Sequence, residues 1–179
     1  MHPILATGSH ARALRAIADL LTRQRLTSAY VGSVARAAWL GGEVAAGSID
    51  VVAVMGPQQK NQIAMMASNR GWRVDRDEIE RSEELDLIPL NFVDDEGEVR
   101  VHVLVASNAL YGRMVAAAGE TTFEDLTIRV PAAEDFAMLL ALGGDEAELQ
   151  ALTADLAFDR RGYNEKLISI GLPGLVVAE

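Results

Sequence analysis

The chain has 179 residues and a net charge of −10, from 16 basic and 26 acidic residues, and it contains no cysteine. The absence of cysteine excludes disulfides, thiol catalysis and cysteine-ligated metal sites. The acidic balance argues against broad nucleic-acid binding, which needs a basic surface to displace counterions. No apolar run approaches the ~20 residues of a membrane span, and the N-terminus lacks the pattern of a secretory signal. We therefore expect a cytoplasmic protein that does not bind membranes.

The first part of the chain alternates predicted helices and strands. Apolar residues spaced i, i+3, i+4, i+7 predict a first helix, with Ser9 as its N-cap, and β-branched runs between turn residues predict strands. Residues 75–86 carry a dense charge cluster that indicates a loop or a short surface helix. Pro89 places its strand at a sheet edge or a bulge. The predicted helices are 11–26, 34–40 and 58–70, and the predicted strands are 28–31, 49–54, 72–75, 87–93 and 98–105.

The later part of the chain is predicted to be mainly helical. Helices are expected at 107–118, 132–142, 145–158 and 160–170, with one strand at 126–130 and a break at Gly143–Gly144. We expect the apolar tail, 172–178, to be covered either by the chain's own core or by a second subunit. We expect an α+β fold in which an α/β core, 1–106, and a mainly helical lobe, 107–179, form one compact unit.

Two short segments carry the first candidate site residues. The strand 28–31 stops at Gly32–Ser33, where a helix opens, and the free N–H groups at such a helix start suit a phosphate. Ser48 and Asp50 lie at positions i and i+2 of the next strand, so their side chains share one face. An ordinary strand-to-helix turn and a loop-capping carboxylate also explain these residues.

His102 is the third candidate residue. It lies in an alternating strand, 98–105, whose valines share one face while Arg100, His102 and Leu104 share the other. A hydrogen-bonded, half-buried histidine and a ligand are both compatible with this position. If the two strands are neighbours, Asp50 can pair with His102 and fix its tautomer.

The order of these motifs resembles the nucleotidyltransferase superfamily, specifically the small bacterial minimal-nucleotidyltransferase or AbiEii-like toxin type. There, a strand ends in Gly-Gly or Gly-Ser, an Asp-x-Asp pair follows, and a third carboxylate lies on a later strand. Gly32–Ser33, Ser48–Asp50 and His102 occupy these positions, and 130–135 resembles the start of a later helix. The resemblance covers about residues 11–170 and implies a mixed sheet flanked by helices, with Gly32 and Ser33 contacting a nucleotide.

The departures from this pattern bear on function. The superfamily uses its carboxylates to hold two divalent cations, which activate the attacking oxygen and neutralise the triphosphate. Only Asp50 remains as a metal-ligand candidate, because Ser48 and His102 replace the other two carboxylates of the catalytic triad. Mg²⁺ and a nucleoside triphosphate are therefore expected to bind weakly, if they bind.

Three hypotheses remain open. In the first, a nucleotidyltransferase-like fold has lost its metal centre and binds a protein partner, a second copy of itself, or a nucleotide. In the second, an active enzyme transfers a nucleoside monophosphate to a protein or RNA acceptor, and another carboxylate, such as Glu43 or Asp86, completes the metal site. The third is an unrelated α/β fold.

Overall fold

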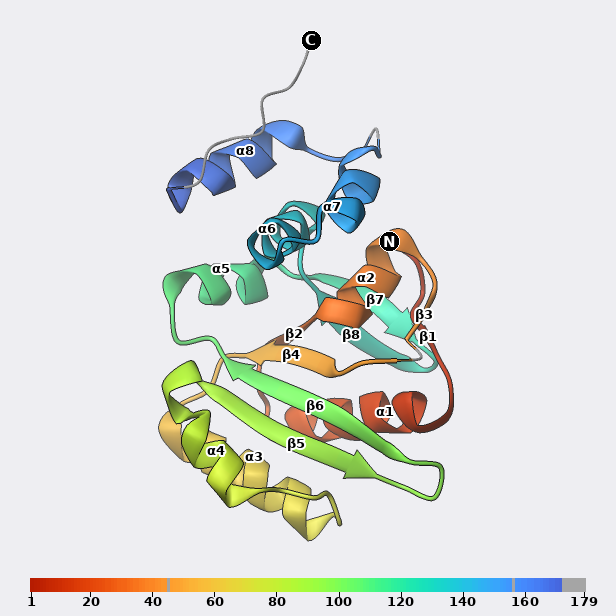
Figure 1. The fold of residues 1–179 in the computed structure, drawn as a ribbon, viewed down its shortest axis with the longest axis vertical. Coiled ribbons are helices and arrows are strands. Elements are labelled where there is room, and N and C mark those ends of the chain that lie inside the picture. The colour runs from red at the N-terminus through yellow and green to blue at the C-terminus, as the bar shows by residue number, and fades with distance from the viewer. Residues whose placement is uncertain (45, 156, 172–179) are drawn as a thin grey trace. The chain divides into compact units, whose positions relative to one another are not determined.

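The computed structural model describes residues 1–44, 46–155 and 157–171. The chain forms two units, Met1–Val130 and Pro131–Glu179. The first unit contains the mixed sheets and the helices around them, and the described part of the second is helical (Figure 1). The predicted α+β class is confirmed. The predicted apolar tail 172–178 lies outside the described residues.

A four-stranded mixed sheet forms the centre of the first unit. Its order is β2 (Ser28–Val31), β4 (Ile49–Ala53), β6 (Glu98–Val105) and β5 (Leu87–Val93). Strands β4 and β6 run parallel, while β2 and β5 run antiparallel to their neighbours. Pro89 lies in β5 at the sheet's edge, as predicted, because proline has no N–H to donate to a central ladder.

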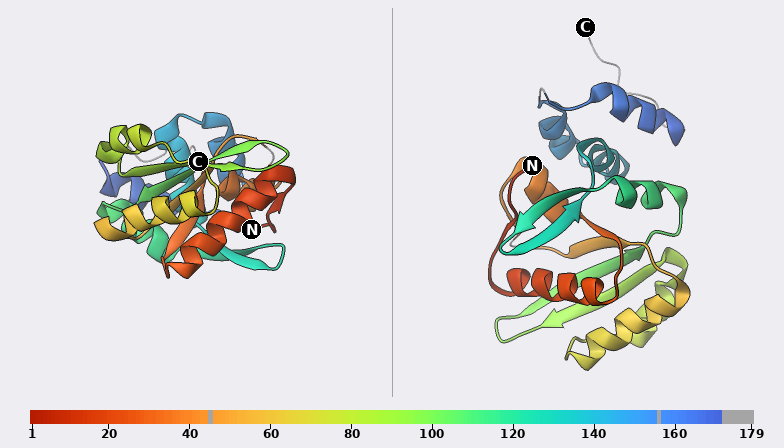
Figure 2. Two further views of the ribbon diagram at one scale, coloured as in Figure 1. Left: turned by 90° about the horizontal axis from the view of Figure 1, so that it is seen from below. Right: turned by 180° about the vertical axis from the view of Figure 1, so that it is seen from behind.

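One face of this sheet is apolar and covered by helices. The alternate residues Ile49, Val51, Val101 and Val103 are fully buried. Helix α1 (Gly8–Arg23) packs on β4 and β6, and α3 (Pro57–Asn69) packs on α1 and β5. Figure 2 shows both helices in front of the sheet in the view from behind. The core of the unit lies between α1 and this valine-rich face.

The start of α1 differs from the prediction. Thr7, not Ser9, is the residue before the helix. The Ser9 hydroxyl instead donates to Asp94 Oδ1 at 2.8 Å, in the turn between β5 and β6. Ser9, which the local sequence predicted as the N-cap, therefore makes a tertiary hydrogen bond to Asp94 instead.

Two further helices flank the residues that the sequence singled out. Helix α2 (Gly32–Leu40) starts directly after β2, and α4 (Arg76–Arg81) is followed by a short 3-10 turn, Glu83–Leu85. The strand predicted at 72–75 is absent, and only Arg73 forms a β-bridge, to Asn91. Asp75 explains the difference, because its carboxylate accepts from the Glu78 N–H and caps α4.

Several small elements complete the first unit. Strands β1 (Leu5–Ala6) and β3 (Glu43–Val44) form a parallel pair, and β7 (Gly119–Phe123) forms a hairpin with the predicted strand β8 (Leu126–Val130). Helix α5 (Ala109–Ala117) contacts β2 and β4, and β8 packs against β2. Residues 107–130 therefore belong to the first unit, and the boundary expected after residue 106 is corrected to Val130.

The second unit contains α6 (Ala133–Gly143), α7 (Glu146–Thr153) and α8 (Arg160–Ser169). Helix α6 ends at Gly144, in the left-handed conformation, close to the predicted break. Helix α7 is shorter than the predicted 145–158. Helix α6 packs on both α7 and α8, and Phe158 contacts Tyr163 edge-to-face with ring centroids 5.6 Å apart. None of the helices in the described ranges is long and apolar enough to span a membrane.

Candidate functional site

Strand register brings Asp50 and His102 side by side. Asp50 of β4 is the partner of both Val31 in β2 and His102 in β6. Residues opposite one another in neighbouring strands point to the same face, and the two side chains meet there, with His102 Nδ1 2.8 Å from Asp50 Oδ1. Both are about a quarter exposed, at 24% for Asp50 and 29% for His102. The pairing expected from the sequence is present.

The other predicted residues lie around the same carboxylate. The Ser48 hydroxyl donates to Asp50 Oδ2 at 3.1 Å, and the Ser33 hydroxyl donates to the Ser48 carbonyl oxygen at 2.9 Å. Gly32 has a φ of +54°, and a Cβ there would lie 2.7 Å from Asp50 Oδ2. All five predicted site residues thus converge, and each oxygen of Asp50 has a hydrogen-bond donor.

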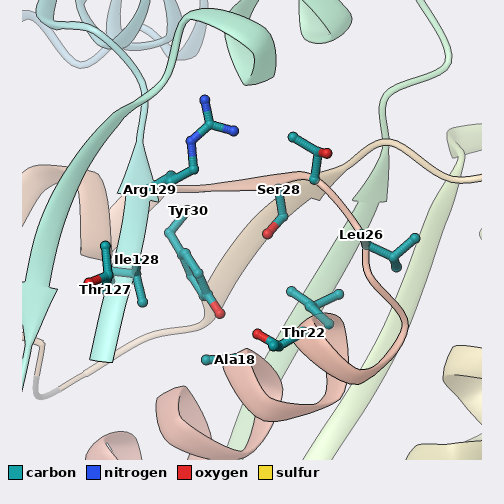
Figure 3. Close-up of a pocket in the computed structure, with 10 residues that line it drawn as sticks. Ala18, Thr22, Leu26, Ser28, Tyr30, Thr127, Ile128 and Arg129 are labelled. Atoms are coloured by element: carbon teal, nitrogen blue, oxygen red, sulfur yellow. The ribbon is translucent and has the colours of Figure 1, made fainter. Parts of the chain in front are cut away.

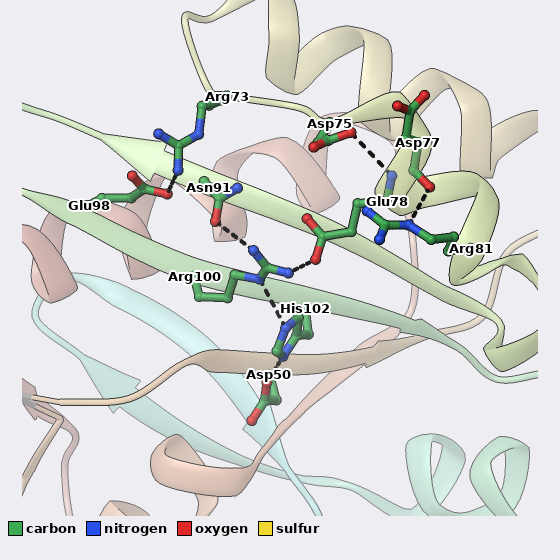
Figure 4. Close-up of polar contacts among 10 residues, drawn as sticks. All are labelled: Asp50, Arg73, Asp75, Asp77, Glu78, Arg81, Asn91, Glu98, Arg100 and His102. Atoms are coloured by element: carbon green, nitrogen blue, oxygen red, sulfur yellow. Dashed lines mark hydrogen bonds and ion pairs between the residues drawn. The ribbon is translucent and has the colours of Figure 1, made fainter.

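Arg100 extends this cluster toward α4 (Figure 4). Its Nε donates to His102 Nε2 at 3.3 Å, and its Nη1 donates to Asn91 Oδ1 at 3.2 Å. Its other terminal nitrogen forms an ion pair with Glu78 of α4. A continuous polar chain therefore runs from Glu78 through Arg100 and His102 to Asp50.

The sequence predicted only part of this chain of contacts from Glu78 to Asp50. The alternation of β6 places Arg100 on the face of His102, which was a usable signal. Glu78 lay in a charge cluster that predicted a solvated segment, and nothing local indicates that α4 turns it toward the sheet.

The hydrogen-bond partners define the tautomer of His102. A guanidinium only donates, so His102 Nε2 accepts from Arg100 with its lone pair. His102 Nδ1 then carries the proton and donates to Asp50 Oδ1. Both ring nitrogens are thus engaged in hydrogen bonds, and neither has a free lone pair for a metal ion.

The cluster is poorly suited to divalent cations. Mg²⁺ prefers several hard oxygen ligands in octahedral geometry, and Asp50 is the only carboxylate at the three expected positions. Within the described part of the chain, no group of three or more histidine, aspartate or glutamate residues could hold a metal ion. Glu43, one of the alternative carboxylates, accepts a hydrogen bond from the Thr7 hydroxyl. Neither Glu43 nor Asp86 belongs to such a group.

The start of α2 is the predicted phosphate site, and Asp50 lies against it. A negative charge is favourable beside the positive end of a helix. The short approach to Gly32 means that the Asp50 carboxylate already supplies this charge. A phosphate entering here would meet a like charge, which is unfavourable without a bridging cation.

No protein-family model matches the sequence, and no curated protein matches it significantly. The relation to nucleotidyltransferases therefore stays a prediction from the order and spacing of the motifs.

Proposed function

We propose that this protein is a nucleotidyltransferase-like scaffold without metal-dependent catalysis that acts as a binding or regulatory protein. One observation carries the proposal. Both oxygens of Asp50 accept hydrogen bonds within the chain, from His102 and from Ser48. The only carboxylate at the three expected ligand positions is thus used to join two strands.

The chemistry of nucleotidyl transfer supports the same conclusion. Two cations activate the attacking oxygen and neutralise the triphosphate, and preorganised charge of this kind is usually the largest catalytic contribution. A single carboxylate cannot balance two divalent cations.

Binding remains as the function of such a scaffold. We propose that its main partner is a protein, either another protein or a second copy of the chain. A nucleotide at Gly32–Ser33 is the weaker ligand. The like charge of Asp50 beside the start of α2 is the reason for this ranking.

Rebuilding the carboxylates tests the proposal. Ser48→Asp with His102→Asp places three carboxylates around the start of α2, and crowded like charges destabilise a metal-free protein. We expect this double variant to melt below the parent in chelator and to regain stability in Mn²⁺. A ligand that binds only the folded state stabilises it by about 2.7 kcal/mol at a hundredfold excess over Kd.

The matched control is the uncharged pair Ser48→Asn with His102→Asn, which alters the same positions without adding carboxylates. The parent and this control should not respond to Mn²⁺. An equal response in all three proteins would mean that these positions do not form the site.

A transfer assay addresses the active-enzyme alternative. The parent is incubated with labelled nucleoside triphosphates, Mg²⁺ or Mn²⁺, and protein and RNA acceptors. We expect no metal-dependent labelling. Labelling that Asp50→Asn abolishes would contradict the proposal and favour an active enzyme with another carboxylate, such as Glu43 or Asp86.

A further inference from the structure

Helix α4 lies beside the sheet with little apolar packing. None of its six residues, all of which the structure describes, is buried. Ile79, the only apolar residue in the helix, is partly exposed and lines a cavity of about 590 Å³ together with residues of α3. A helix of six residues is also too short to be stable by itself. Contacts other than apolar burial must therefore hold α4 in place.

A cavity beside a helix does not by itself loosen the helix. Helix α1 also borders a cavity, with a volume of about 280 Å³, and Figure 3 shows Ala18 and Thr22 of α1 among the residues that line it. Five residues of α1 are nevertheless buried, so apolar packing holds this helix on the sheet. Helix α4 has no buried residue and depends on polar contacts instead.

Both ends of the segment that contains α4 are fixed to strand β5. Before the helix, Arg73 and Asn91 exchange two backbone hydrogen bonds, with N–O distances of 2.9 and 3.1 Å. After the helix, the Leu87 N–H donates to the carbonyl oxygen of Ser82 at 3.3 Å, and Ser82 is buried. Residues 74–81 therefore connect two points that are both anchored on the same strand.

An ion pair joins the middle of this segment to the sheet. Glu78 pairs with Arg100 of β6, and Figure 4 shows the Glu78 carboxylate directed from α4 toward the guanidinium. The side chains of Asp75 and Arg81 bond only within the segment. The ion pair is partly exposed, at 26% for Glu78 and 38% for Arg100. Because water reaches it, the pair contributes modestly to stability and is weakened by salt.

We propose that residues 74–81 form a strap that opens as a unit while its two ends stay on β5, and that the Glu78–Arg100 ion pair holds it closed. Segments with few buried contacts open locally without unfolding the rest of a protein. Opening separates Arg100 from the Glu78 carboxylate and exposes the guanidinium at the end of the polar chain that leads to Asp50. The strap goes beyond the proposed function, because it concerns the motion of α4 and operates whether or not a partner binds.

Amide hydrogen exchange of the full chain, followed by NMR, measures this opening. The N–H groups of Ile79 and Ser82 donate to carbonyl oxygens within the strap, so these strap amides exchange when the strap opens. The N–H groups of Leu87 and Asn91 form the bonds at the two ends and serve as anchor amides. We expect protection factors about tenfold lower at the strap amides than at the anchor amides. Equal protection at both would overturn the proposal.

Glu78→Gln tests the role of the ion pair, because it keeps the shape of the side chain and removes its charge. We expect a further loss of protection of about tenfold at the strap amides and no change at the anchor amides. The matched control is Glu80→Gln, which removes the same charge from an exposed position of the same helix and should exchange like the parent. Unchanged exchange in Glu78→Gln, or an equal loss of protection at strap and anchor amides, would overturn the proposal.

Salt gives an independent measurement of the same contact. Raising NaCl from about 0.05 to about 0.5 M shortens the screening length severalfold and weakens a partly exposed ion pair. We expect the strap amides of the parent to lose protection by about threefold, and those of Glu78→Gln to change little because the pair is already absent. The same response to salt in both proteins would mean that this ion pair does not hold the strap closed.

Discussion

Replacing Gly32 by alanine tests whether the Asp50 carboxylate lies against the start of α2, on which the proposed function depends. Gly32 has a φ of +54°, and the added Cβ would lie 2.7 Å from Asp50 Oδ2. Alanine in the left-handed conformation costs roughly 1–2 kcal/mol wherever it occurs. The carboxylate must also move, because real Cβ atoms do not approach other atoms so closely.

The second contribution comes from the hydrogen bonds that hold Asp50 in place. Moving the carboxylate weakens its bonds from His102 Nδ1 and Ser48 Oγ, at 2.8 and 3.1 Å. Hydrogen bonds to charged groups contribute about 1.5–3 kcal/mol each when buried, and a quarter-exposed carboxylate retains less because water screens it. We therefore expect Gly32→Ala to lower the free energy of unfolding by roughly 3 kcal/mol in total.

Gly71→Ala is the matched control. Gly71 also has a left-handed φ, +83°, but a Cβ there meets no atom within 4 Å. It should lose only the roughly 1–2 kcal/mol of backbone strain. Urea unfolding at neutral pH measures both variants, alone and with Asp50→Ala. Removing the carboxylate should reduce the cost of Gly32→Ala to that of Gly71→Ala, and an unchanged cost would refute the placement of Asp50.

Two predictions concern charged groups elsewhere. Hydrogen bonds from Arg12 and, more weakly, Ser9 hold the pKa of Asp94 well below its usual range. The Asp94 carboxylate therefore stabilises the fold above about pH 4, and this stabilisation is lost as the pH falls through the lower folded pKa. Asp94→Asn should flatten the loss of stability below about pH 4 in acid-titrated thermal melts, and a curve as steep as the parent's would contradict this. In the second unit, Lys166 Nζ lies 2.5 Å from Asp135 Oδ1, and the Asp135 side chain is only 7% exposed. Lys166→Met should lower the free energy of unfolding by on the order of 3 kcal/mol, measured by urea unfolding followed by circular dichroism. Adding Asp135→Asn should recover most of this loss, because it removes the charge left without a partner. No recovery would mean that the buried charge is not the cause.

Elements with a strong local pattern could be predicted from the sequence. The alternating valines of β6 predicted its bounds, and the same alternation placed His102 and Arg100 on one face. Strand β7 was missed because Gly119–Phe123 is mostly polar and small and is held as a strand by its hairpin with β8. The prediction of a strand at 72–75 was wrong because Asp75 caps α4, although apolar and polar residues alternate in this segment.

The contacts of the candidate site also fall into two groups, those that strand alternation predicts and those that depend on tertiary packing. The meeting of Ser48, Asp50 and His102 follows from strand periodicity and one parallel pairing, both accessible to sequence reasoning. The ion pair of Arg100 with Glu78 depends on how α4 lies against the sheet.

The outer edge of β5 is closed to strand addition. An exposed edge presents free N–H groups on alternate residues and invites pairing with another chain. Here Pro89 has no N–H, the Leu87 N–H donates to the Ser82 carbonyl oxygen, and the Asn91 N–H donates to the Arg73 carbonyl oxygen. Three successive outward positions therefore offer no free donor. An incoming strand would find no free backbone donor along this stretch, so strand addition and fibrillar self-assembly through β5 are disfavoured.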